Sequence, residues 1–476
     1  MSGDLYRLAM TVLHPGYEGT SAPEWLRRAL GEGLGGVVLF ARNAIDARLV
    51  REFRAENPDV VVAIDEEGGT VTRLEVVEGS SFPGNRALGV ADDVALTERV
   101  GRQIGRMLGE LDITLNYAPD ADVNSNPANP VIGVRSFGPT ADLVARHTAA
   151  YVNGVQGAGV AACAKHFPGH GDTVTDSHLA LPTVHAPREV LAERDLPPFK
   201  AAIDAGVRSI MSGHLLIPAL DPSVPATLSR AVLTELLRGE LGFDGMLVTD
   251  AIEMQAVADM FAPGEIAVRA LNAGVDAICM GVSTEEIVYE IRDAVVAAVR
   301  SGALPEERLE QAASRVRALS GWYAAQSELR DKARLDVDPA VGLEAARAAL
   351  STAGSAVLDR APLVVEVNTR LNKAVDPATP TGITAALISL LPETAIVRMD
   401  PSGELPRFDE RPIVLVVHDA ARHPWVRETV AKALAARPDV IVVDTGIPAP
   451  PGGPTHVATH GISRVSAQAA AEWLTR

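Results

Sequence analysis

Residues 165–178 read KHFPGHGDTVTDSH, and the rest of the sequence is organised around this stretch. The apolar run at 160–164 comes directly before it, so Lys165 and His166 are expected at the C-terminal end of a buried strand, with a loop after them. The stretch holds three histidines, two aspartates and a lysine. A loop this rich in proton-transfer groups indicates chemistry that is held on a scaffold.

Apolar runs alternate with helical patterns on both sides of this stretch, over residues 1–325. Such alternation favours parallel βα units over hairpins. Eight strands are expected, at residues 8–13, 36–40, 60–64, 114–118, 160–164, 208–212, 246–249 and 276–280. Helical patterns lie between them, at residues 46–56, 92–111, 142–156, 193–205, 230–241 and 263–273. Eight parallel strands with helical crossovers predict an α/β fold of the (β/α)8 TIM-like barrel type.

An open, doubly wound sheet is the alternative, but it would normally carry a glycine-rich phosphate turn after its first strand, and His14-Pro15-Gly16 is not one.

In barrels, catalytic residues lie at the C-terminal ends of strands. Five of the eight expected strands end in titratable groups, which are Asp65-Glu66-Glu67, Asp120, Lys165-His166, His214 and Asp250. The competing interpretation is that aspartate and glycine only form turns at strand ends.

The character of the sequence changes after residue 325. A charged segment at 327–338 and a helical pattern at 342–350 precede a second series of apolar strands, at 363–367, 395–398, 413–417 and 440–443, with helical patterns at 382–391 and 425–436. We therefore expect a catalytic barrel domain at 1–325, a linker at 326–350 and a smaller C-terminal α/β sandwich domain at 351–476.

Charge and composition exclude several classes of partner. The chain of 476 residues has 61 acidic and 43 basic side chains and a net charge of -18, which argues against nucleic acid or an anionic membrane as the main partner. Cys163 and Cys279 lie in apolar runs, so buried thiols are expected rather than a disulfide or a metal pair. The N-terminus MSGDLYRLAM does not have the pattern of a signal peptide. A cytoplasmic monomer is expected.

The residue types present also limit the chemistry. His166 and His170 have a spacing that occurs in zinc sites, but Pro168 and Gly169 prevent a helix from placing both imidazoles on one face, so no metal or cofactor is expected. The serines of the region lack the G-x-S-x-G nucleophile elbow. Carboxylates and histidines remain, and these are the groups of proton transfer and carbohydrate chemistry.

Six blocks resemble, in order, the bacterial β-N-acetylglucosaminidases of glycoside hydrolase family 3, including its two-domain members. The blocks are GGVVLFARN (35–43), DEEGGTVTRL (65–74), NYAPDADVN (116–124), IGVRSFG (132–138), KHFPGHGDTVTDSH (165–178) and GFDGMLVTDAIEM (242–254). This resemblance spans residues 5–320 and implies a barrel that removes a terminal β-linked N-acetylglucosamine, with net retention of anomeric configuration. The expected substrates are recycled peptidoglycan (muropeptide) fragments.

The resemblance also implies roles for single residues. Asp250 matches the nucleophile, His178 the general acid/base and Asp176 its partner. The residues that match the family's sugar-binding groups are Asp65, Arg135, Lys165 and His166. Without the resemblance, the competing interpretation of Asp250 is the cap of a helix that begins near Ala251.

Three alternatives stay open. The same catalytic residues serve relatives that use phosphate in place of water, so the first alternative is a β-N-acetylglucosaminide phosphorylase. The second is a β-glucosidase. The third, non-enzymatic alternative is a barrel that only senses amino sugars. In the family's β-glucosidases the second domain supplies a glutamate acid. Because His178 already matches that role, we expect the second domain to be structural or to wall the cleft. Gly169 and Gly171 suggest that the loop moves when substrate binds.

Overall fold

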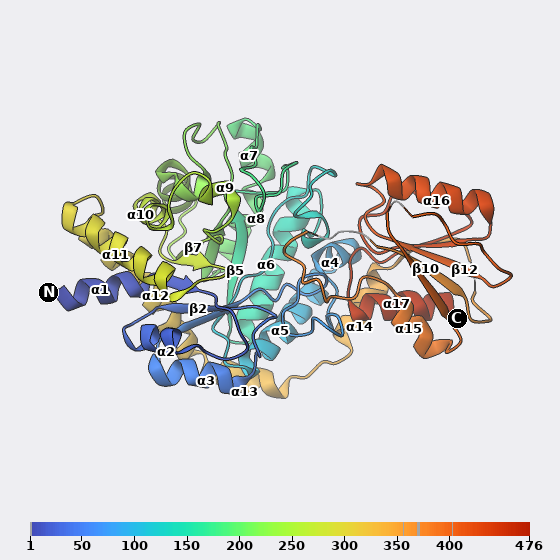
Figure 1. Ribbon diagram of the computed structural model, residues 1–476, viewed down its shortest axis with the longest axis horizontal. Coiled ribbons are helices and arrows are strands. Elements are labelled where there is room, and N and C mark those ends of the chain that lie inside the picture. Colours follow the sequence, from blue (N-terminus) through green and yellow to red (C-terminus); the bar gives the residue numbers. More distant parts are fainter. Residues whose placement is uncertain (1, 356, 369–371, 402) are drawn as a thin grey trace.

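The computed structural model describes residues 2–355, 357–368, 372–401 and 403–476, with side chains from Asp4 onward. Figure 1 shows a larger α/β unit built from the first two thirds of the chain and a smaller one built from the last third. Within the described residues, no helix is both long and apolar enough to cross a membrane.

Eight short parallel strands form the centre of the larger unit. They are β1 (Leu13–Pro15), β2 (Gly36–Leu39), β3 (Val61–Ile64), β4 (Leu115–Asn116), β5 (Ala161–Phe167), β6 (Ser209–Ser212), β7 (Met246–Thr249) and β8 (Ile278–Met280). Strands β2 to β7 pair in sequence order, and β1 pairs with β8. The amide of Thr249 donates to the carbonyl of Ala277 over 3.0 Å, which joins β7 to the segment before β8. The predicted barrel architecture is confirmed.

One expected strand is wrong in its extent. Residues 8–13 were predicted as the first strand, whereas α1 (Ser2–Thr11) occupies most of that segment and β1 begins only at Leu13. Leu5, Leu8 and Ala9 are buried at i, i+3 and i+4 spacing, and residues 8–11 of the run belong to a helix that contacts α11 (Glu285–Ser301) and α12 (Glu306–Ala325). A short apolar run alone does not distinguish these two structures.

Helices surround the barrel. They are α2 (Glu24–Gly31), α3 (Ala47–Glu56), α4 (Asn85–Ala91), α5 (Val94–Glu110), α6 (Ala141–Gly157), α7 (Arg188–Arg194), α8 (Pro197–Asp204), the π-helix η3 (Ala231–Glu240), α9 (Gln255–Ala258) and α10 (Pro263–Ala273), with the short 3-10 turns η1 (Gly133–Arg135) and η2 (Ala226–Leu228). The single helix expected at 193–205 is instead α7 and α8. Pro197 and Pro198 explain the break, because proline is tolerated in the first turn of a helix but not in its interior.

Helix α3 illustrates how the sequence determines where a helix of this outer layer begins and which face it buries. The side chain of Asp46 accepts a hydrogen bond from the amide of Leu49 over 2.8 Å and so caps the helix at its start. Leu49, Val50 and Phe53 recur on one face and are buried against the barrel. Burial of each such side chain contributes about 1.5–3 kcal/mol.

The lumen of the barrel is packed rather than open. Strand residues that point inward form one buried apolar cluster, which includes Val61, Leu115, Cys163 and Met246. Val316 and Leu319 of α12 belong to the same cluster. Cys163 and Cys279 are both free and buried, as the sequence predicts.

The smaller unit is a three-layer α/β domain. Its sheet has the order β11 (Ala395–Met399), β10 (Leu363–Val367), β12 (Ile413–Val417), β13 (Ile441–Asp444), β14 (Thr455–Ala458) and β9 (Ser351–Ala353), and only β9 is antiparallel to its neighbour. Alternate strand residues pack on α15 (Thr384–Leu390) and α17 (Arg464–Leu474) on one face and on α16 (Pro424–Ala436) on the other. The expected α/β sandwich is therefore confirmed, although β9 and β14 were not predicted.

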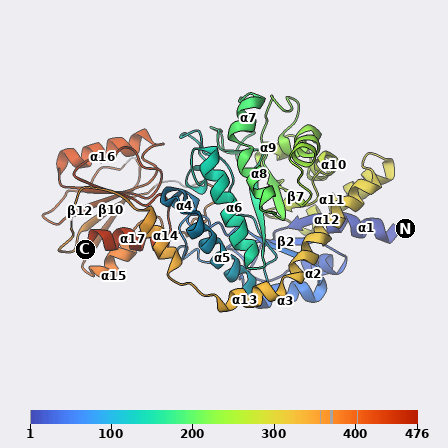
Figure 2. The ribbon, with the colours of Figure 1, turned by 180° about the vertical axis from the view of Figure 1, so that it is seen from behind.

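Helices α13 (Ser327–Leu335) and α14 (Val341–Ala349) lie between the two units in sequence. Figure 2 shows α14 beside α4 and the C-terminal domain, and α14 contacts α4, α5 and α17. A loop that follows β10 also crosses to the barrel: Asn372 Nδ2 donates to the carbonyl of Val131 over 2.9 Å, and Arg73 Nη1 donates to the carbonyl of Ala374 over 3.0 Å. The C-terminal domain thus reaches the rim at which the strands of the barrel end.

Candidate active site

A cavity of about 440 Å³ lies at the carboxyl ends of the barrel strands. Six of the seven predicted site residues line it, namely Asp65, Arg135, Lys165, His166, His178 and Asp250. The seventh, Asp176, contacts His178. The structure therefore brings together residues that come from three strand ends and two loops, as expected if the C-terminal rim carries the function.

Asp250 directly follows β7 and opens into the cavity. Its Oδ1 accepts a hydrogen bond from the amide of Ala251 over 2.8 Å. Burial alone would raise the pKa of Asp250, but the nearby imidazoles of His166, His214 and His178 lower it overall, so the carboxylate is ionised. Because α9 begins only at Gln255, Asp250 is not a helix cap, and that interpretation is wrong.

His178 and Asp176 form a hydrogen-bonded pair. His178 Nδ1 lies 2.7 Å from Asp176 Oδ1, and the His178 amide donates to the same oxygen over 2.9 Å. Burial raises the pKa of Asp176, but the hydrogen bonds from His178 lower it overall, so Asp176 presents a negative charge to the imidazole. The pair fixes Nδ1 and leaves Nε2 as the ring nitrogen with no partner among the described residues.

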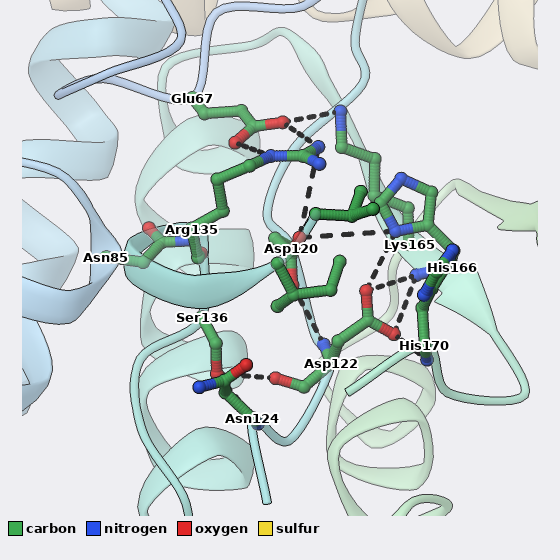
Figure 3. A network of polar contacts seen from close by, with 12 residues as sticks. Glu67, Asn85, Asp120, Asp122, Asn124, Arg135, Ser136, Lys165, His166 and His170 are labelled. Atoms are coloured by element: carbon green, nitrogen blue, oxygen red, sulfur yellow. Dashed lines mark hydrogen bonds and ion pairs between the residues drawn. The ribbon is translucent and has the colours of Figure 1, made fainter. Parts of the chain in front are cut away.

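Asp65, Lys165 and Arg135 belong to one buried ionic cluster, part of which Figure 3 shows. Lys165 Nζ lies 2.7 Å from Asp65 Oδ1 and 2.8 Å from Glu67 Oε1. Arg135 binds Glu67 in bidentate fashion, through Nε at 3.0 Å and Nη2 at 2.6 Å. Burial raises the pKa of Glu67, but Arg135 and Lys165 lower it far more. Both cations retain N–H groups that have no partner among the described residues.

Asp122 fixes the position of His166. Its carboxylate accepts hydrogen bonds from the amide and Nδ1 of His166, the latter at 2.8 Å, and from the amide of His170 at 2.6 Å (Figure 3). Burial and the charge of Asp122 raise the pKa of neighbouring Asp120 well above its usual range, so Asp120 is protonated. The Nε2 atom of His166 is left free of partners in the described part of the chain and belongs to a residue that lines the cavity.

Asp120, Asp122 and His166 have ligand atoms within 4.8 Å of one another, and a metal ion would need such a grouping. Both oxygens of Asp122 already accept hydrogen bonds from His166, and one of them also accepts from His170. A cation would have to displace those bonds. The hydrogen-bonding role accounts for the cluster without a metal ion.

Sequence reasoning missed three contributions to the site. Glu67 stands two residues after Asp65 in the quoted block DEEGGTVTRL, and its place beside the predicted residue was the available signal. Asp122 lies 44 residues before its partner His166, a separation that no local pattern reveals. Residues 373–377 of the C-terminal domain also line the cavity, so this domain walls the cleft, which is one of the two roles expected for it. In the same loop as the acid/base pair, Asp172 forms an ion pair with Arg194 at 2.9 Å.

A carboxylate, an imidazole–carboxylate pair and a polar cluster lie together at the carboxyl rim of a (β/α)8 barrel, and these are the groups that barrel glycosidases use. The pattern of the glycosyl hydrolase family 3 N-terminal domain matches residues 20–319. The chain belongs to glycosyl hydrolase family 3.

Relatives in sequence and structure agree with this assignment. The chain is 36% identical over 351 residues to a beta-hexosaminidase A of Pseudoalteromonas piscicida, an alignment that spans 66% of this chain and 56% of that relative. It is 37% identical over 268 residues to the beta-hexosaminidase LpqI of Mycobacterium tuberculosis, which covers 55% of this chain and 68% of the relative. A family 3 beta-N-acetylglucosaminidase from Paenibacillus sp. str. FPU-7 superposes with a TM-score of 0.86 and 34% identity, over 99% of this chain and 96% of that one.

Proposed function

We propose that the protein is a retaining exo-β-N-acetylglucosaminidase, which hydrolyses terminal β-linked N-acetylglucosamine by double displacement. The observation that carries the proposal is that Asp250 and His178, the latter paired with Asp176, open into the same cavity. The names of the related beta-hexosaminidases and of the Paenibacillus enzyme support the choice of sugar.

In the first step, Asp250 attacks the anomeric carbon while His178 Nε2 donates its proton to the glycosidic oxygen. The bond to the leaving group breaks, the alcohol departs, and the sugar is held as an ester of Asp250. The lowered pKa of Asp250 suits this role, because the nucleophile must be ionised. Asp176 holds Nδ1 of the imidazole, so that Nε2 is the nitrogen left to face the glycosidic oxygen.

In the second step, neutral His178 removes a proton from a water molecule, whose oxygen attacks the same carbon. The ester bond to Asp250 breaks, the carboxylate is regenerated, and N-acetylglucosamine leaves with the configuration of the substrate. Two displacements on opposite faces of the carbon account for the net retention.

The remaining predicted residues bind the sugar. Asp65 accepts hydrogen bonds from sugar hydroxyls, while Lys165 and Arg135 donate to sugar oxygens through the N–H groups that protein partners leave free, and the free Nε2 of His166 accepts from a sugar hydroxyl. Their contacts with Glu67 and Asp122 support this assignment, because side chains that are already fixed lose little rotamer freedom when substrate binds.

Peptidoglycan fragments are the proposed natural substrate, since their N-acetylglucosamine units are β-linked. We also propose a cytoplasmic monomer with a catalytic domain at 1–325, a linker at 326–350 and a sandwich domain at 351–476.

The test is the cleavage of p-nitrophenyl β-N-acetylglucosaminide and of the corresponding glucoside, with and without inorganic phosphate. Free N-acetylglucosamine, formed at a rate indifferent to phosphate, is the expected result. A sugar 1-phosphate and phosphate-dependent turnover would instead identify a phosphorylase, and preference for the glucoside a β-glucosidase. No turnover of either sugar would favour the sensor hypothesis.

A further inference from the structure

The tripeptide Asp176-Ser177-His178 is attached to the protein almost entirely through its middle residue. Ser177 Oγ lies 3.1 Å from His170 Nε2, and the Ser177 carbonyl accepts from the amide of Ala256 over 3.3 Å. Residues 174–180 are all described, and within this segment only Ser177 makes hydrogen bonds to the rest of the protein. The position of the acid/base pair therefore depends on Ser177.

Large apolar side chains do not provide a second attachment for this segment, although the Asp176 side chain is only 11% exposed. Its two large apolar side chains, Val174 and Leu179, are 68% and 56% exposed. Ser177 itself is buried, at 2% exposure. An apolar anchor would be the usual way to fix a loop of this kind, and here the loop has a buried hydroxyl in its place.

His170 is well suited to hold that hydroxyl, because it is itself fixed on every side. Its Nδ1 lies 2.8 Å from Thr173 Oγ1, its amide donates to Asp122 over 2.6 Å, and its carbonyl accepts from Asn129 Nδ2 over 2.8 Å. Burial lowers the pKa of His170 to about 4, so the ring is neutral at physiological pH. Both ring nitrogens of this neutral imidazole are bonded to protein hydroxyls, so neither is available to the substrate.

The chain on either side of His170 is equally constrained. A Cβ atom at Gly171 would lie 1.7 Å from the carbonyl oxygen of Val123, and Gly169 has a φ of +130°. Close packing thus explains these two glycines, which sequence reasoning connected with loop motion. The constrained part of the loop therefore extends to Thr173, and the segment 174–180 begins after it.

We propose that His170 is a positioning residue, which holds the acid/base pair in its working place through its hydrogen bond to Ser177. The proposal rests on the proposed function, in which His178 is the general acid/base. It predicts that loss of the His170–Ser177 bond impairs proton transfer and leaves sugar binding intact, because Ser177 makes no hydrogen bond to Asp65, Arg135, Lys165 or His166.

The experiment compares Ser177→Ala with Thr175→Ala, a control that removes a hydroxyl of the same loop that has no partner in the described structure. Each variant is assayed on a series of aryl β-N-acetylglucosaminides that spans good and poor leaving groups. Ser177→Ala should lower kcat/KM about tenfold for the poorest leaving groups, the size expected for one ordinary hydrogen bond, and much less for the best ones. Inhibition by free N-acetylglucosamine should be unchanged, and Thr175→Ala should behave as wild type throughout.

Two further variants make the test independent of folding defects. The amide of His170→Gln is expected to reach Ser177 and retain most activity, whereas His170→Leu should match Ser177→Ala in its dependence on the leaving group. An equal loss on all leaving groups, or no difference between Ser177→Ala and Thr175→Ala, would overturn the proposal.

His178→Ala separates this result from a failure of the proposed function. If His178→Ala shows no dependence on the leaving group, the acid/base assignment itself is wrong. If it shows a strong dependence and Ser177→Ala shows none, only the positioning role of His170 is wrong. In the His178→Ala background, Ser177→Ala should have no further effect on kcat/KM.

Discussion

Replacing Glu67 with glutamine tests the electrostatic basis of the sugar-binding cluster. Asp65 and Glu67 together balance the charges of Lys165 and Arg135, while Asp120 is held protonated. The Glu67→Gln variant keeps the size of the side chain and removes one negative charge. Lys165 and Arg135, with Arg73 3.9 Å from Asp65, would then face one carboxylate, which is partly exposed to the cavity.

Removal of one partner from a buried ion pair costs about 3–5 kcal/mol, because the other charge stays buried without compensation. The structure offers one partial remedy, since Asp120 Oδ2 lies 3.9 Å from Arg135 Nη2 and would ionise beside the unbalanced guanidinium. We therefore expect Glu67→Gln to lower the free energy of unfolding by about 3 kcal/mol, near the lower end of that range. Urea-induced unfolding followed by circular dichroism measures this difference.

The matched control is Glu265→Gln on α10, which removes the same charge from an ion pair with Arg269 at 2.6 Å. Both partners of that pair are more than 40% exposed, so the expected change is at most about 0.5 kcal/mol. A Glu67→Gln variant within about 1 kcal/mol of wild type would refute the electrostatic reasoning.

Three further predictions concern other parts of the molecule. His14 is buried in β1 with neither ring nitrogen hydrogen-bonded, and burial lowers its pKa from 6.5 to about 3. As the pH falls, the unfolded chain therefore binds a proton at His14 before the folded protein does, so the free energy of unfolding drops by roughly 3 kcal/mol between pH 7 and pH 4. In His14→Leu, urea unfolding should show a smaller decrease over this pH range. An unchanged decrease would contradict this. Asp176→Asn should lower kcat on substrates with poor leaving groups roughly 100-fold and leave inhibition by N-acetylglucosamine unchanged, which steady-state kinetics would check; a loss below threefold would speak against the Asp–His pair. Arg73→Met removes the hydrogen bond to the Ala374 carbonyl and a cation 3.9 Å from Asp65. KM should therefore rise about fivefold with kcat little changed, and an unaltered KM would count against a role for this contact between domains.

The parts of the site that sequence predicts are those set by local pattern. Lys165 and His166 follow a continuous apolar run, so their place at a strand end could be inferred, and the spacing of Asp176 and His178 lets one side chain reach the other. The helix–strand ambiguity of short apolar runs explains why α1 was mistaken for a strand.

The parts that sequence does not reveal depend on long-range contacts. Arg135 meets Glu67 across 68 residues of sequence, and His166 meets Asp122 across 44. Residues 373–377 reach the cavity from another domain, through Arg73 and the carbonyl of Ala374. Only the folded barrel brings such groups together, because their separations bear no relation to the period of a strand or a helix.

The central claim is that Asp250 forms a covalent bond to the sugar, and trapping the intermediate tests it most directly. The protein would be treated with a 5-fluoro N-acetylglucosaminyl fluoride, whose ester with the enzyme hydrolyses slowly, then digested and mapped by mass spectrometry. The account predicts time-dependent inactivation and one labelled peptide, with the sugar on Asp250 and no label in Asp250→Asn. A label on another carboxylate, or turnover that yields the inverted anomer without any label, would contradict it.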